Sequence, residues 1–153
     1  MLGRFDPRRR QAEPVAPGKA DTAGDVDLTG IVTAFHADLA EWLGADAPPK
    51  VFDRVSGQLD EEFTSIVTTG QTVDRETLLA GLWSARNLQP GLAIEVSDVK
   101  QLARSGNLLV VRFVAENRMG ELRTARTVTA ALVTDGRTYL WRTVHETATP
   151  AHT

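Results

Sequence analysis

The segment from residue 108 to residue 147 constrains the fold of this chain more than any other. It contains three apolar-rich runs separated by two short turn signals, Met119-Gly120-Glu121 and Asp135-Gly136. Asp-Gly between two strand-like runs is the commonest sequence signature of a two-residue hairpin, because both central residues must accept positive φ. The segment therefore predicts three consecutive antiparallel strands joined by short turns.

A two-residue loop at Asp135-Gly136 would also decide which side chains share a face of the sheet. Directly opposed residues lie on the same face, and alternation carries that face along each strand. The face predicted to be buried consists of Arg126, Val128, Ala130, Leu132, Tyr139, Trp141, Thr143 and His145, joined on the preceding strand by Leu109, Val111, Phe113 and Ala115. The other face, which carries Glu116, Glu146 and several arginines and threonines, is predicted to be largely exposed to solvent.

Composition limits the classes of protein that this chain could be. With 153 residues, of which 42% are hydrophobic, it is long enough for one domain with a single core. It has no cysteine, which excludes disulfides, thiolate nucleophiles and cysteine zinc sites. No apolar run approaches the roughly 20 residues needed to span a bilayer, and the N-terminus lacks the apolar middle of a signal peptide. The net charge of −3 argues against nucleic acid as a partner. We therefore expect a cytoplasmic protein without membrane contact.

Residues 1–26 are predicted to be a disordered N-terminal tail, and residues 150–153 a short C-terminal one, so that 27–149 form a single domain. The first 26 residues hold almost no large apolar side chains and cannot bury enough surface to offset the entropy lost on ordering. The triplet Arg8–Arg10 is interpreted either as a contact with an anionic surface or as part of a solvated tail.

Three helices are predicted before the long run of strands. Each is bounded by residues that start or stop helices: Asp27 and Gly44 for the first, Pro48-Pro49 and Gly57 for the second, and Asp74 and Asn87 for the third. The first has an apolar stripe at three- and four-residue steps. His36 lies beside that stripe, so it is either a boundary residue or a side chain that looks into a pocket.

Two further strands are predicted at 63–69 and from residue 92 onward. In the second of these the apolar phase changes between Val96 and Val99, which indicates a bulge or bend near Asp98. The order of elements favours an α+β fold, in which three N-terminal helices pack on a curved antiparallel sheet. The helical stripes and the apolar sheet face are the only surfaces available to bury, and such an arrangement forms a cone.

The chain resembles the nuclear transport factor 2-like superfamily, the cystatin-like cone that includes ketosteroid isomerases, SnoaL-like polyketide cyclases and many uncharacterised bacterial domains. The resemblance is nearest to the uncharacterised bacterial members and covers roughly residues 28–149. Beyond the element order it rests on three short features: the strand ending 141–147, the segment 125–127 and Glu116. It implies a pocket between the helices and the concave sheet face, and it implies no single activity, because this fold hosts enzymes and non-enzymes alike.

Arg126 and His145 are the candidate catalytic residues, since the predicted register makes them cross-strand neighbours on the concave face. An imidazole held neutral by the adjacent guanidinium could act as a general base, while Arg126 stabilises an enolate or oxyanion. The alternative is that both side chains satisfy backbone carbonyls at the open end of the cone. Six further candidates for binding a small organic ligand are Phe113, Tyr139, Trp141 and Thr143 on the sheet, with His36 and Trp83 on the helices.

The predicted inward face contains no Asp or Glu, which argues against one family of mechanisms. Ketosteroid isomerases and polyketide cyclases resemble one another in placing a carboxylate base inside the cone. Here Glu116 and Glu146 fall on the opposite face, where they are interpreted as a solvated surface or a polar dimer contact. The sequence also lacks a phosphate-binding loop, metal-ligand spacing and a nucleophile elbow, so neither a cofactor nor a metal is expected.

Two classes of function remain. The first is a binding or interaction domain, whose cone holds a small organic molecule or whose sheet face forms a homodimer. The second is a cofactor-independent isomerase, cyclase or lyase that acts on a small carbonyl or carboxylate compound. An enclosed cavity of roughly 300 Å³ or more with Arg126 and His145 inside it would favour a ligand, whereas a cone filled by Trp42, Trp83 and Trp141 would favour a structural role.

Overall fold

The computed structural model describes residues 27–149; the two predicted tails, with Arg8–Arg10, lie outside the described residues. In chain order the elements are α2 (Leu28–Gly44), α3 (Pro49–Gly57), β1 (Leu59–Ile66), β2 (Thr72–Asp74), α4 (Arg75–Ser84), β3 (Ala93–Ser105), β4 (Leu108–Met119), β5 (Leu122–Thr134) and β6 (Tyr139–Ala148). The predicted caps are present, because Asp27 accepts a hydrogen bond from the amide of Gly30 and Asp74 accepts one from that of Thr77. Within the described range, no helix is both long enough and apolar enough to cross a membrane.

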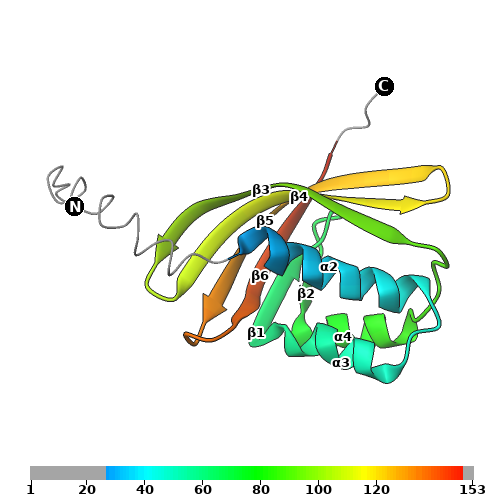
Figure 1. Ribbon diagram of the computed structural model, residues 1–153, viewed down its shortest axis with the longest axis horizontal. Helices are drawn as coiled ribbons and strands as arrows, with labels where there is room; N and C mark the ends of the chain where they lie inside the picture. Colours follow the sequence, from blue (N-terminus) through cyan, green and yellow to red (C-terminus); the bar gives the residue numbers. More distant parts are fainter. Residues whose placement is uncertain (1–26, 150–153) are drawn as a thin grey trace, which may run out of the picture.

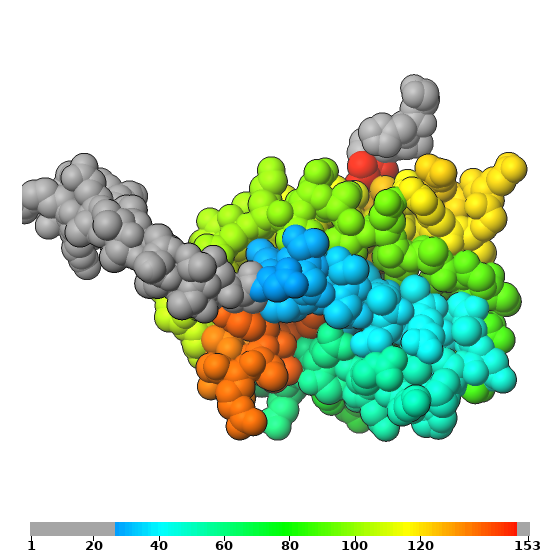
Figure 2. Space-filling model, viewed as in Figure 1, coloured from blue at the N-terminus to red at the C-terminus, as the bar shows by residue number. Residues whose placement is uncertain are grey.

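The six strands form one curved sheet in the order β2-β1-β6-β5-β4-β3, and the three helices lie on its concave side (Figure 1). In the space-filling view α2 packs directly along β3, with α3 beside it (Figure 2). Neighbouring strands are antiparallel except for β1 and β6, which are parallel. The predicted α+β class, with three helices on a curved sheet, is confirmed. The parallel pair and the short strand β2 were not predicted, and β1 begins four residues before the strand predicted at 63.

Gly44 ends α2 as predicted, and the structure explains why the residue is glycine. It is not one of the glycines with positive φ. Instead, a Cβ at Gly44 would lie 2.8 Å from the backbone nitrogen of Leu92, so the requirement is for space. The carbonyl of Gly44 accepts a hydrogen bond of 2.9 Å from the amide of Gly91. The loop after α4 therefore satisfies carbonyl groups that the helix end leaves without intrahelical partners.

The buried apolar side chains form two clusters. The larger cluster lies between α2 and the concave sheet face and contains Val32, Phe35, Val55, Leu59, Phe63, Leu109, Val111, Phe113, Ala115, Val128, Ala130, Leu132 and Trp141. The smaller cluster joins the end of α2 to α3 and contains Trp42, Leu43, Ala47, Val51 and Leu92. The three tryptophans therefore do not fill one cone together, since Trp141 belongs to the first cluster and Trp42 to the second.

The register between β4 and β5 follows the prediction. Phe113 pairs with Val128 and Ala115 with Arg126, so the two strands present their apolar sets to the same side. On β3, Asp98 has a positive φ of 52° and the pairing with β4 shifts between residues 97 and 100. The predicted bulge near Asp98 is confirmed.

The hairpin between β5 and β6 departs from the predicted register. Thr134 pairs with Tyr139 instead of Arg137, so the loop has four residues where two were predicted. The Asp135 carboxylate accepts hydrogen bonds of 2.9 and 3.1 Å from the second and third backbone amides after it, which closes the wider loop around its own side chain. Gly136 has a positive φ of 96° and Asp135 does not, whereas a type I′ turn requires both.

A β-bulge at Arg142 then shifts the register a second time. Leu132 pairs with Trp141, but the preceding residue Ala131 pairs with Thr143, which leaves Arg142 as an extra residue on β6. The wider loop moves the pairing of β6 by two positions, so each side chain keeps its predicted face. The bulge moves the pairing by one further position, which exchanges the two faces. Because successive side chains point to opposite faces, every side chain of β6 beyond the bulge lies on the face opposite to the predicted one.

Candidate functional site

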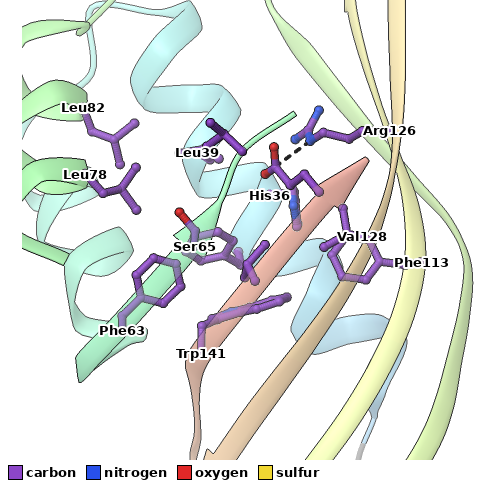
Figure 3. Close-up of a pocket in the computed structure, with 14 residues that line it drawn as sticks. His36, Leu39, Phe63, Ser65, Leu78, Leu82, Phe113, Arg126, Val128 and Trp141 are labelled. Atoms are coloured by element: carbon purple, nitrogen blue, oxygen red, sulfur yellow. Dashed lines mark ion pairs between the residues drawn. The ribbon is translucent and has the colours of Figure 1, made fainter. Parts of the chain in front are cut away.

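A cavity of about 100 Å³ lies between the helices and the concave face of the sheet (Figure 3). Its lining is contributed by α2, α4, strands β1 and β4 to β6, and the loop after β1, and the residues are Phe35, His36, Leu39, Phe63, Ser65, Val67, Leu78, Leu82, Phe113, Arg126, Val128, Trp141, Val144 and Glu146. Most of the wall is apolar, and Figure 3 shows Arg126 at one end of it. The cavity is smaller than the roughly 300 Å³ expected of a complete ligand pocket.

The bulge at Arg142 determines which side chains of β6 reach this cavity. Val144 and Glu146 face inward and line it. His145 is exposed on the outer face and pairs with residues 66 and 129 of the neighbouring strands. The structure therefore does not bring His145 together with Arg126, and the predicted cross-strand pairing of these two residues is wrong. The predicted outward position of Glu146 is wrong for the same reason.

Arg126 lies near the start of β5, faces the cavity and makes two polar contacts. Its Nη1 donates a hydrogen bond of 2.8 Å to Oδ1 of Asn117 on the adjacent strand. Its Nε lies 3.6 Å from Oε2 of Glu146, and the two side chains are 15% and 25% exposed respectively. A separation of 3.6 Å exceeds the roughly 2.7–2.9 Å of a charge-assisted hydrogen bond, so this pair is loosely held. Guanidinium N–H groups that these contacts do not engage are available to an oxygen atom of a ligand.

Glu146 is the carboxylate that the predicted inward face lacked. Burial raises its pKa above the ordinary value, and the charge of Arg126 opposes that rise without cancelling it. This partly buried carboxylate loses solvation, while its cationic partner stays 3.6 Å away. A carboxyl group with a raised pKa beside a cation, in a cavity, is suited to accept and return a proton.

His36 is buried on α2 and lies edge-on to three aromatic rings of the cavity wall. Its ring centroid is 5.4, 5.3 and 6.0 Å from those of Phe35, Phe113 and Trp141. The pKa of His36 is lowered to about 4, mainly by burial; the hydrogen bond to the Val32 carbonyl opposes the shift and the charge of Arg126 adds to it. Nδ1 lies 2.8 Å from that carbonyl oxygen, which can only accept, so Nδ1 carries the proton. Nε2 of the neutral ring is then an acceptor.

The remaining predicted ligand-binding residues divide into two groups. Phe113 and Trp141 line the cavity, each 1% exposed. Thr143 faces outward, where its hydroxyl lies 3.2 Å from that of Thr64 on β1, and Tyr139 is half-buried at the edge of the larger cluster without lining the cavity. Trp83 is 54% exposed and stacks on Trp42 outside the cavity.

Glu146 is the main cavity residue that was not predicted from the sequence, although a signal for it exists. Along β6 the inward apolar positions change phase between Trp141 and Val144. A change of the same kind between Val96 and Val99 indicated the bulge on β3. Applied to β6, it would have turned Glu146 inward. Ser65 is buried on β1, where that strand pairs in parallel with β6, and it had no comparable signal because this pairing was not predicted.

The described part of the chain contains no group of three or more His, Asp or Glu side chains that could hold a metal ion. The polar groups of the cavity are one guanidinium, one carboxyl, one imidazole and one hydroxyl, from Arg126, Glu146, His36 and Ser65. Together they can hydrogen-bond and exchange a proton with a small enclosed molecule.

No protein-family model matches the sequence, and no curated protein matches it. Solved structures do match in fold. A nuclear transport factor 2-like protein of unknown function from Pseudomonas aeruginosa is 24% identical with a TM-score of 0.73, over 78% of this chain and 95% of that chain.

Two other solved structures carry functional descriptions. A proposed scytalone dehydratase from Novosphingobium aromaticivorans is 12% identical with a TM-score of 0.63, over 82% of this chain and 85% of that chain. The beta subunit of the benzoate 1,2-dioxygenase from Burkholderia mallei is 9% identical with a TM-score of 0.64, over 80% and 89%. At these identities the likeness shows the fold alone. This chain has the nuclear transport factor 2-like fold, as its sequence indicated.

Proposed function

We propose that this chain binds a small organic molecule that has an apolar body and one carbonyl or hydroxyl group. The observation that carries the proposal is the cavity itself, which has apolar walls and gathers its charged groups at one end. Such a combination is typical of ligand sites, where apolar surface provides affinity and a few polar groups fix the orientation. An apolar cavity of about 150 Å³ is known to admit benzene, so about 100 Å³ suits a group slightly smaller than a six-membered ring.

The polar groups of the cavity suit an uncharged oxygen function. Arg126 can donate to a carbonyl or hydroxyl oxygen, while Nε2 of His36 can accept from a hydroxyl. Glu146 offsets the charge of Arg126, which lowers the advantage of a fully ionised ligand. The fold is compatible with this role and does not select it, since the similar structures include a protein of unknown function, a proposed dehydratase and a subunit of a dioxygenase.

Filling the cavity from the helix side is expected to weaken ligand binding strongly. Leu78 on α4 lines the cavity, whereas the next residue, Leu79, packs against the larger cluster without lining it. Leu78→Trp should weaken the binding of cyclopentanone, measured by NMR titration, by about tenfold or more, because a loss of only about 1.4 kcal/mol suffices for that factor. Leu79→Trp is the matched control and should leave the dissociation constant within about twofold of the original, a change of less than 0.5 kcal/mol.

Two results would count against this proposal. One is the absence of any saturable binding of cyclopentanone or of other ketones of similar size. The other is an equal loss of affinity in both tryptophan variants, which would place the ligand outside the cavity.

The inward position of Glu146 specifically favours a second candidate function, a cofactor-independent isomerase, cyclase or lyase acting on a small carbonyl compound. In this reading Glu146 removes a proton from the carbon next to the carbonyl group, and Arg126 stabilises the negative charge that develops on the carbonyl oxygen. The raised pKa of Glu146 brings this carboxylate closer to the range in which a general base is effective. A homodimer and a cytoplasmic location remain predictions of the sequence alone.

Glu146→Gln separates the two candidates. A catalytic base contributes about 10²- to 10⁴-fold, so the variant should slow the exchange of the α-protons of cyclopentanone in deuterated water by about that factor and keep its affinity nearly unchanged. Glu116→Gln is the control, because Glu116 lies on the outer face and pairs with Arg118. If neither the original protein nor the Glu116 variant accelerates exchange above buffer, catalysis by Glu146 on this ketone is excluded and the binding function stands alone.

A further inference from the structure

A second hollow lies directly beyond the charged end of the cavity. This outer recess has a volume of about 460 Å³, is more open to solvent than the inner cavity, and lies at the β1–β2 turn beside the ends of β4, β5 and β6. Arg126 and Glu146 line both the inner cavity and the outer recess. Their side chains therefore form the partition between the two spaces, which agrees with their exposed fractions of 15% and 25%.

The two side chains that form the partition are only loosely joined to each other. Nε of Arg126 and Oε2 of Glu146 are 3.6 Å apart, and no hydrogen bond joins the two side chains in the described structure. The firmer contact of Arg126 is with Asn117, which also belongs to the recess. An oxygen or nitrogen atom of a ligand placed at the partition could bond to either charged group without breaking a short ion pair.

The sizes of the two spaces point to a ligand that occupies both. Sites for small organic molecules usually measure about 300–1,000 Å³. The inner cavity, at about 100 Å³, takes only part of such a molecule, while the recess, at about 460 Å³, falls within that range. We propose that the outer recess is a second subsite, which takes the polar part of an amphipathic ligand whose apolar part fills the inner cavity. This inference rests on the proposed binding function and extends it to a ligand class.

The lining of the recess indicates an uncharged polar group. Besides the two opposite charges of the partition, it offers the hydroxyl groups of Thr68 and Thr124 and the amide of Asn117. Oδ1 of Asn117 already accepts a bond from Arg126, so its NH₂ group is the part left to donate. Donors and acceptors are thus both present, and the two charges offset each other. An amide or alcohol satisfies this set better than a carboxylate or an ammonium group would.

Three compounds test the subsite by NMR titration. Cyclopentanone probes the inner cavity, N-(2-hydroxyethyl)acetamide probes the recess, and 2-cyclopentyl-N-(2-hydroxyethyl)acetamide joins an apolar ring to the same polar chain. The joined compound should bind about tenfold more tightly than cyclopentanone, the gain expected from one or two net hydrogen bonds. The polar chain alone should bind only weakly.

Thr124→Tyr should remove that gain by filling the recess from β5. Its expected effect is to raise the dissociation constant of the joined compound about tenfold, to that of cyclopentanone, and to leave cyclopentanone itself unaffected. Arg123→Tyr is the matched control, because it is an exposed position adjacent on the same strand that does not line the recess. Tyrosine is well accepted in strands, so both variants should fold.

The outcomes separate this inference from the function on which it rests. If cyclopentanone binds and the joined compound gains nothing, or if the gain survives Thr124→Tyr, the second subsite is wrong and the inner site stands. If no ring compound binds to the original protein at all, the proposed binding function fails, and the subsite fails with it.

Discussion

Replacing Trp141 by alanine is expected to lower the free energy of unfolding by about 3 to 5 kcal/mol, the usual cost of deleting a large aromatic side chain from a packed core. Trp141 is 1% exposed and its ring lies 5.1, 6.0 and 6.0 Å from those of Phe35, His36 and Phe113. These neighbours are held by α2 and β4, so they cannot all move inward to fill the space. Urea unfolding followed by circular dichroism measures the change.

Trp83→Ala is the matched control, because it deletes the same side chain at a position that is 54% exposed. Trp83 stacks on Trp42 and meets Phe52 edge-on, at centroid separations of 5.5 and 5.1 Å. With about half of its surface already in water, its removal should cost about 1 kcal/mol. If the two variants lost equal free energy of unfolding, the placement of Trp141 in the larger core cluster and of Trp83 outside it would be contradicted.

Lowering the pH from 7 to 4 is expected to remove about 3 kcal/mol of stability through His36 alone. Burial lowers the pKa of this histidine from 6.5 to about 4 in the folded chain. The unfolded chain therefore binds a proton in this interval that the folded chain does not bind. The stability contributed by the neutral ring is fully present above pH 6.5 and is lost as the pH falls toward 4.

His36→Leu provides the comparison, because its stability should lack this part of the pH dependence. Other groups titrate in both proteins and cancel in the difference. Hydrogen bonds from backbone amides lower the pKa of Asp74 and of Asp135, so the stability that these two carboxylates contribute to the fold is also lost in acid. The raised pKa of Glu146 acts in the opposite direction. If the two proteins lost equal stability between pH 7 and 4, His36 would have to become charged in the fold near its ordinary pKa.

Features that depend on neighbours in the sequence could be predicted from the sequence alone. The caps at Asp27 and Asp74, the turn at Gly120 and the bulge near Asp98 are all where the sequence placed them. Each is decided by residues within a few positions: a side chain that caps a helix, a glycine that accepts positive φ, or a change in the apolar alternation along a strand. Together they were enough to predict the class of the fold and the inward face of β4 and β5.

The composition of the site was decided by tertiary structure, at the bulge on β6. Arg142, the extra residue, donates a hydrogen bond of 2.8 Å to the backbone carbonyl of Glu62 and lies 3.7 Å from the carboxylate of Asp60, both on β1. The parallel pairing of β1 with β6 is itself irregular at this point. A contact between residues 80 positions apart thus accompanies the change of phase that turns Glu146 toward Arg126 and His145 toward solvent. Local turn chemistry could not predict this, because one inserted residue reverses every later side chain, and the residues beside it in space lie far away in the sequence. The change of apolar phase between Trp141 and Val144 is the trace that the bulge leaves in the sequence.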